Sequence, residues 1–214
     1  MIFSVLSFLA FMMGNALSDS TYNGYEHPIW KLAAEQPEDK SYEVREYAAA
    51  NWTSTGMQGH FGKDARKAAF WRLFNYIQGS NSAGSIMSMT VPVTTCISTG
   101  ATLFDTKRTM SFYIPLKFQA EPPTPTNTDL HIEERQPMTA YVRTFSGYAE
   151  ETDWWEHIYV LHADMLRNGV NTANIDLKSF LAAGYDSPFH LINRRNEVWL
   201  TTPLTPTPTT KNDA

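Results

Sequence analysis

The amino-acid sequence predicts an α+β fold made of two similar halves. Two amphipathic segments, 62–81 and 150–169, have helical periodicity, and each closes on a glycine. Each follows strand-like segments and a Ser/Thr-Gly pair, at 54–56 and 145–147. Apolar residues make up 43% of the 214 residues, which is enough to bury a core. The pattern therefore indicates two halves whose sheets join, with one helix on each and a groove between them as a natural ligand site.

The pattern of the first half predicts a strand or hairpin, a helix, two strands and a proline-rich loop, at residues 41–57, 62–81, 86–97, 108–118 and 121–129. Pro92 favours an edge or a bulge for its strand, because proline cannot donate to a neighbour. Gly79 is a natural end for the helix. The apolar arc of this helix is predicted to contain Ala65, Ala69, Phe70, Leu73, Phe74, Tyr76 and Ile77.

The second half repeats this plan. Its pattern predicts two strands, a helix, a turn and a closing strand, at residues 130–135, 138–149, 150–169, 184–188 and 197–202. Gly169 ends the helix. Its apolar side is predicted to contain Trp154, Trp155, Ile158, Leu161, His162, Met165 and Leu166. Local identity between the halves is low, so the repeat is one of order rather than of residues.

The two ends of the chain differ from its middle. Residues 1–18 are apolar and then small, which is typical of a cleaved signal peptide, and cleavage would leave a mature start near Asp19. We therefore expect a secreted protein, or a cytoplasmic one if the leader is not cleaved. The segment 203–214 is a Pro/Thr tail predicted to be disordered. Residues 19–202 then form one domain, with no segment suited to stable membrane insertion.

Charge and cysteine content exclude some classes. The formal net charge of −5 disfavours general nucleic-acid binding. Cys96 is the only cysteine, so no intrachain disulfide is possible, and a small buried thiol is expected there. Asn51 begins the only N-x-S/T sequon and is a possible glycosylation site.

Catalytic and metal motifs are absent from the sequence, which disfavours an enzyme. His157 and His162 are five residues apart on a helix and face different directions. His162 lies on the apolar arc, as a core histidine with one satisfied hydrogen bond or as an axial ligand. Glu133 and Glu134 are adjacent in a strand and point to opposite faces, so they are no acid/base pair.

The first helix has a basic end on an aromatic stripe. Arg66 lies one turn before Phe70, and Lys67 lies beside Phe74. This pattern suits a flat apolar ligand with anionic groups. Alternatively, the stripe is plain core and the bases extend to water.

Five stretches in order carry a resemblance: "YEVREY…WTST", "FWRLFNYIQGSN", "MSMTVPV", "PPTPT…IEER…AYVRTFSGYA" and "GYDSPFHLINRRNEVWL". Together they resemble the SOUL family of haem-binding proteins, and within it the haem-binding protein 2 branch, over about residues 41–202. The resemblance implies a distorted antiparallel β-barrel with two long helices, built from a duplicated βαββ-type unit. It also implies non-enzymatic binding of haem or another tetrapyrrole in a shallow apolar cleft. A rival interpretation is a protein-interaction module that keeps the fold and has lost the cleft.

The resemblance places the cleft on the first helix and the loop before the closing strand. It assigns a basic contact to Lys67 and an apolar contact to Phe70. At Asn75 and His190 the chain departs from relatives that have lysine there, so a propionate partner is lost at Asn75. His190 either loses a charge or supplies an axial nitrogen to the haem iron.

The run Asn193–Glu197, "NRRNE", is a signature of the same family that ends the barrel. Alternation puts Arg195 and Glu197 on one face of the strand. We expect Arg194 or Arg195 to pair with an acid of the other half, such as Glu43 or Glu133. The alternative is that one of these arginines holds a propionate.

Overall fold

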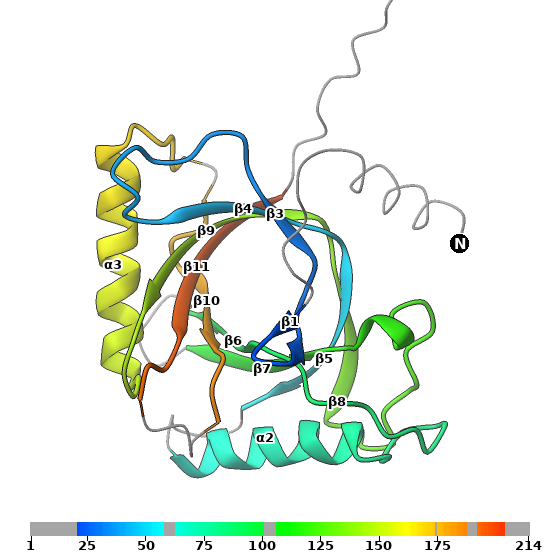
Figure 1. Ribbon diagram of the computed structural model, residues 1–214. Helices are drawn as coiled ribbons and strands as arrows, with labels where there is room; N and C mark the ends of the chain where they lie inside the picture. The colour runs from blue at the N-terminus through cyan, green and yellow to red at the C-terminus, as the bar shows by residue number, and fades with distance from the viewer. Residues whose placement is uncertain (1–20, 58–62, 101–105, 174, 188–191, 204–214) are drawn as a thin grey trace, which may run out of the picture.

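A nine-stranded antiparallel sheet, flanked by two helices, forms the body of the protein (Figure 1). The computed structural model describes residues 21–57, 63–100, 106–173, 175–187 and 192–203. The elements are β1 (Thr21–Tyr22), β2 (Tyr25–Glu26), β3 (Trp30–Leu32), β4 (Glu43–Tyr47), β5 (Ala50–Gly56), α2 (Lys63–Ile77), β6 (Val93–Ser98), β7 (Lys107–Tyr113), a 3₁₀ turn (Leu116–Phe118), β8 (Leu130–Arg135), β9 (Met138–Phe145), α3 (Glu151–Arg167), β10 (Ser179–Gly184) and β11 (Asn196–Pro203). The leader, most of the tail and His190 lie outside the described residues.

The sheet has the order β3-β4-β9-β11-β10-β6-β7-β5-β8, and it curls into a partial barrel (Figure 1). Each pair of neighbouring strands is antiparallel. The predicted α+β class and the distorted barrel with two helices are therefore confirmed.

The strand order contains a duplication. The segment β5-α2-β6-β7 gives the sheet order β6-β7-β5, and β9-α3-β10-β11 gives β10-β11-β9. The two units join where β6 pairs with β10. The strand that precedes each unit pairs with the other unit. Strand β4, which precedes the first unit, pairs with β9 of the second, and β8, which precedes the second unit, pairs with β5 of the first. The predicted βαββ repeat is confirmed, and the exchange ties the halves together.

Both helices end in the same way. Gly79 has φ +106° and Gly169 has φ +75°, values that glycine adopts without strain. After each helix, backbone N–H groups donate to carbonyls of the last helical turn in a Schellman pattern. In α2, the Gly79 amide donates to the Tyr76 carbonyl, and the Ser80 amide donates to the Asn75 carbonyl. The two glycine stops predicted from the sequence are confirmed.

The helices lie against the outer face of the sheet, α3 beside β9 and β11 and α2 below β5 and β7 (Figure 1). Under α3, Ile158, Leu161 and Met165 pack on Val198 and Leu200. Leu166, which the periodicity places on this arc, is 53% exposed. Under α2, the buried side chains are Ala69, Leu73, Tyr76, Ile77, Met87, Met110, Phe112 and Leu130.

The inner face of the curl holds a third core and several charges. Tyr47 stacks on Trp199 at a centroid distance of 4.9 Å, and both are buried. The β1–β2 hairpin lies across this interior in Figure 1. Its Tyr22 packs edge-on against Tyr185 at 5.1 Å, and its Glu26 carbonyl accepts from Val91. The interior is thus closed on this side by the first described residues.

Several element boundaries differ from the prediction. The stretch 41–57 is two strands that do not pair with each other, since β4 and β5 lie in different halves of the sheet. The strand predicted for 86–97 begins only at Val93, because Pro92 cannot donate, and β6 is an interior strand rather than an edge. The strand predicted for 108–118 ends at Tyr113. Pro203 belongs to β11 and not to the tail.

Four strands were not predicted. The strands β1 and β2 have two residues each and β3 has three. Such short strands contain too few residues to show an alternation of apolar and polar side chains. Strand β10, "SFLAAG", lies between β11 and β6 and is covered on both faces. A strand buried on both faces has no polar alternation, and alanine has little strand propensity.

Candidate functional site

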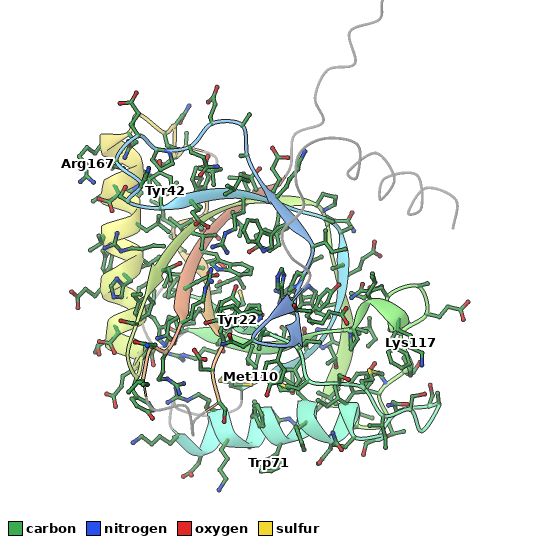
Figure 2. All side chains as sticks on the ribbon, in the orientation of Figure 1. Tyr22, Tyr42, Trp71, Met110, Lys117 and Arg167 are labelled. Carbon is green, nitrogen blue, oxygen red and sulfur yellow. The ribbon has the colours of Figure 1, made fainter. Side chains whose placement is uncertain are left out.

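An exposed aromatic ridge runs along α2. Phe70 and Phe74 stack at a centroid distance of 5.9 Å, and Trp71 stands nearly perpendicular to both, at 6.0 Å and 5.4 Å. Phe70 also contacts Phe112 of the sheet at 5.3 Å, which anchors the cluster. Phe70 and Phe74 are partly buried, whereas Trp71 is 49% exposed. Figure 2 labels Trp71 on α2, below Met110 of the sheet. We call Lys67, Phe70, Trp71, Phe74 and Asn75 the α2 ridge.

Trp71 is unusual among the tryptophans of this chain. All six lie in described residues, and Trp71 is the exposed one among them. An exposed indole joined to two further rings forms a continuous apolar patch, which is typical of a surface that contacts something. Trp71 falls off the predicted buried arc and was therefore not among the predicted site residues. Its position between Lys67 and Asn75, four residues from each, was the available signal.

Polar residues predicted for the site form the two ends of the α2 ridge. Lys67 and Asn75 are exposed, one turn before and one turn after Trp71. Arg66 is partly buried. The neighbouring Arg72 is used for structure, since it donates to the Thr55 hydroxyl at 3.1 Å and to the Gly56 carbonyl at 2.8 Å. The structure thus brings together Lys67, Phe70, Phe74 and Asn75 on one helix, with the Lys67 side chain exposed beside the rings.

The loop before β11 is fixed at its base. Asp186 accepts from the Arg195 amide at 2.6 Å, and Arg194 donates to the carbonyls of Asp186 and Ser187 at 3.1 Å and 2.6 Å. The guanidinium of Arg194 also lies 4.5 Å from the Tyr148 ring. His190, the proposed axial ligand, falls between these anchored ends but outside the described residues. Its role stays a prediction.

Glu197 is the centre of a buried charge cluster inside the barrel. Its carboxylate accepts from Arg45 through two nitrogens at 3.1 Å and from Arg195 at 2.6 Å and 2.9 Å. It also accepts from the Tyr185 hydroxyl at 2.9 Å and the Trp199 indole N–H at 2.8 Å. Glu197 and Arg45 have no exposed surface. Burial alone would raise the pKa of Glu197, but the two arginines outweigh burial and hold the pKa below its ordinary value.

This cluster corrects the expected pairing of "NRRNE". The strand prediction is right that Arg195 and Glu197 share a face, since they pair directly. The partner expected for Arg195 is wrong, because Arg195 pairs with Glu197 of its own strand. The same expectation for Arg194 stays a prediction. The contact between the halves is made by Arg45 reaching Glu197, while Glu43 also binds Arg45 at 2.6 Å. The "NRRNE" segment therefore contributes the carboxylate of Glu197, and not an arginine, to the ion pair between the halves.

A second polar cluster on the inner face involves Glu133. Ser54 donates to Glu133 at 2.6 Å and lies 2.8 Å from the Ser111 hydroxyl, while Arg135 donates to Glu133 at 3.0 Å. The Arg135 guanidinium covers the Trp52 ring at 4.0 Å. Ser54 has no exposed surface, so its hydroxyl cannot reach a substrate in this conformation. Glu134 points outward and is exposed, as alternation predicted.

The remaining candidates have ordinary surroundings. The Asn51 amide donates to the Gln119 carbonyl at 2.8 Å, a bond that a glycan would have to displace, so glycosylation stays a prediction. Cys96 is partly exposed and lies 3.6 Å from the Ser179 hydroxyl. His162 is partly buried, and its Nε2 has no hydrogen-bond partner in the described residues, contrary to the satisfied bond expected of a core histidine. His157 instead accepts from Arg143 at 3.3 Å.

Neither a metal-binding cluster nor a membrane-spanning helix is found within the described ranges. No group of three or more His, Cys, Asp or Glu side chains there is placed to hold a metal ion. None of the described helices combines the length and hydropathy of a membrane span.

Comparison with known proteins identifies the family. The model of the SOUL heme-binding protein family matches residues 25–201. The chain belongs to the SOUL family. Heme-binding protein 2 from Homo sapiens is 37% identical over 86% of this chain and 90% of its own length. Heme-binding protein 1 from Xenopus tropicalis is 35% identical over 87% of this chain and 97% of its own. The resemblance inferred from five sequence stretches is confirmed.

Solved structures of other proteins share the fold of this chain but do not indicate its function. A hydrolase from Listeria innocua superposes with a TM-score of 0.54 at 11% identity, covering 79% of this chain and 94% of its own. An uncharacterised conserved protein from the same organism gives 0.52 at 13% identity, with the same two coverages. At such identities the SOUL chain shares only its architecture with these proteins.

Proposed function

We propose that this SOUL protein binds haem or a related tetrapyrrole on the α2 ridge without catalysing a reaction on it. The observation that carries the proposal is the exposed Phe70–Trp71–Phe74 cluster with a lysine at one end, in a family whose relatives are named for heme binding. An exposed aromatic surface favours a flat apolar ring. An adjacent cation favours acid groups on that ring.

The residues present fit such a ligand. Covering the exposed rings would contribute about 25 cal/mol per Å² of apolar surface removed from water, so stacking supplies most of the affinity. Lys67 is exposed, and an ion pair there would contribute about 0–1 kcal/mol, which is enough to orient the ligand but not to hold it. When bound, haem would supply a redox-active iron. The protein's own groups bind and orient the macrocycle, and we assign His190 as the nitrogen available to the iron.

A non-enzymatic role is supported by the clusters that could otherwise serve catalysis. The Ser54 hydroxyl is buried and donates to a carboxylate whose pKa is lowered, so Glu133 is a poor base for activating it. Burial alone would raise the pKa of Glu133, and Arg135 more than offsets this. Glu197 is saturated by six donor contacts. Both clusters are suited to holding the barrel together.

The alternative, a protein-interaction module without tetrapyrrole binding, is favoured by one observation. Asn75 is exposed and neutral at the position where the tetrapyrrole-binding pattern calls for a cation. In that case the α2 ridge would contact a protein surface instead of a macrocycle.

A haemin titration tests these alternatives. A saturable one-to-one shift of the Soret band at micromolar haemin is expected for the folded chain. Weaker binding by Lys67→Ala would indicate orientation by charge, and an altered spectrum in His190→Ala would indicate axial ligation. A folded wild-type chain that gives no shift would support the interaction module.

We also propose that the protein is secreted and that its leader is removed near Asp19. The support is the apolar run followed by Ala16-Leu17-Ser18, a pattern that signal peptidase cuts. The hairpin that begins at Thr21 packs onto the barrel, so this cut would leave the described fold intact. Determining the first residue of the protein recovered from the culture medium tests the proposal. A recovered chain that begins at Met1, or that stays inside the cell, would contradict it.

A further inference from the structure

The exposed side of α2 is chemically asymmetric along its length. Lys63, Lys67, Trp71 and Asn75 follow one another at intervals of four residues, so they form one row along the helix. All four are exposed. The row therefore passes from two cations, across an indole, to a neutral amide.

The N-terminal end of the row is the end that attracts anions. Lys63 and Lys67 lie in the first turns of α2, where the helix macrodipole adds positive potential. Asp64 is also exposed in this turn and reduces, but does not cancel, the charge of the two lysines. Beyond Trp71 the row offers Asn75 and then the exposed Gln78, neither of which is charged. Phe74, beside Asn75, adds an apolar edge.

Tetrapyrroles differ in how acid groups are placed around the ring. Protoporphyrin and haem carry both carboxylates on one edge, and the opposite edge is apolar. Uroporphyrin carries carboxylates around its whole rim. A ring centred on Trp71 can direct one edge to Lys63 and Lys67, but its opposite edge must then lie against Phe74 and Asn75.

We propose that the α2 row selects tetrapyrroles whose carboxylates lie on a single edge and rejects those with carboxylates all around the rim. This inference rests on the proposed function, because it specifies the ligand class of the same site. A carboxylate forced against the apolar Phe74 edge loses hydration without gaining a cation, which costs affinity. Trp71 is the specificity-determining residue that sets the position of the ring, since it lies between the cationic and the neutral ends. Asn75 is neutral, so the edge of the ring that lies against it must be an edge without carboxylates.

Metal-free porphyrins give the sharpest test, because they remove iron ligation by His190 from the comparison. The full-length chain is titrated with protoporphyrin and with uroporphyrin, followed by porphyrin fluorescence. We expect protoporphyrin to bind at least tenfold more tightly. In Asn75→Lys, uroporphyrin affinity should rise about threefold to fivefold, the effect of one exposed ion pair, with little change for protoporphyrin. Trp71→Ala should weaken protoporphyrin about tenfold.

Ala163→Lys is the matched control, because it adds the same charge at an exposed position on α3. Equal affinity of the wild-type chain for both porphyrins would overturn the inference while leaving the proposed function standing. The same holds if Ala163→Lys raises uroporphyrin affinity as much as Asn75→Lys does, since selection would then follow net charge. Failure of the wild-type chain to bind protoporphyrin and haemin alike would instead remove the proposed function itself.

Discussion

The barrel interior around Glu197 and the α2 ridge around Trp71 combine the same kinds of side chain in opposite ways. Inside, an acid, two arginines and an indole N–H satisfy one another with no exposed surface on the acid. Outside, Trp71 is half exposed, and Lys67 makes no ion pair in the described part of the chain. Aromatic and charged residues therefore do not by themselves mark a ligand site. The accessible and incompletely satisfied set is the one suited to a ligand, and the saturated set maintains the fold.

Glu197→Ala would break the interior most severely. The substitution leaves the partly buried Arg195 without its acid and the buried Arg45 with only the half-exposed Glu43. Truncating one partner of a buried pair costs about 3–5 kcal/mol. Urea denaturation should show this loss in the free energy of unfolding. Glu43→Ala is the control, because it removes an acid that binds the same Arg45 but is 51% exposed, and it should cost less than about 1 kcal/mol. A loss in Glu197→Ala no larger than in the control would contradict the structural role.

The same substitution at two tryptophans compares the regions directly. Trp199→Phe removes a hydrogen bond to Glu197 and leaves unfilled space in the core, which should cost about 2 kcal/mol. Trp71→Phe, on the exposed ridge, should change the free energy of unfolding by less than about 0.5 kcal/mol. Chemical denaturation of the two variants beside wild type measures both. If Trp71→Phe is the more destabilising of the two, the ridge is part of the core and not a free surface.

The fold was predictable where periodicity and glycine signals agree. Both helices and their ends at Gly79 and Gly169 follow from apolar spacing and from the conformations available to glycine. Strand pairing was not predictable from local pattern. The adjacent strands β4 and β5 resemble a hairpin, but each finds its partners in a different half of the sheet. Such long-range exchange leaves no trace in residue spacing.

The site was predictable only in part. The stripe of Phe70 and Phe74 with Lys67 could be inferred from helical geometry, and the family resemblance added Asn75 and His190. Trp71 was not predicted because an exposed residue breaks no hydrophobic pattern, and only its exposure in the structure distinguishes it from a core tryptophan. The partner of Glu197 was missed for a similar reason, since Arg45 lies 152 residues away.

The smallest predicted effect is a pH dependence that separates the outer face from the interior. His157 belongs to α3, and its ring stacks on Phe145 of β9 at a centroid distance of 3.8 Å. Burial, and then Arg143, lower the pKa of His157 below its ordinary value of 6.5, although Glu156 and Asp153 oppose this. The folded state therefore binds fewer protons than the unfolded state, so the stabilisation is present above pH 6.5 and is lost as the pH falls below it. The pKa of Glu197 is also lowered, so its contribution is lost only as the pH falls below its ordinary value of 4.5.

The free energy of unfolding should accordingly fall in two separate steps as the pH is lowered. His157→Phe keeps the ring stack on Phe145 and removes the titrating group. It should flatten the small decline in stability between about pH 6.5 and pH 5 while leaving the steeper decline below pH 4.5 unchanged. Urea midpoints of wild type and variant across this pH range measure the difference. An identical decline in both would place the proton uptake on another histidine. A change confined to the region below pH 4.5 would mean that the interior, and not the face under α3, responds to His157.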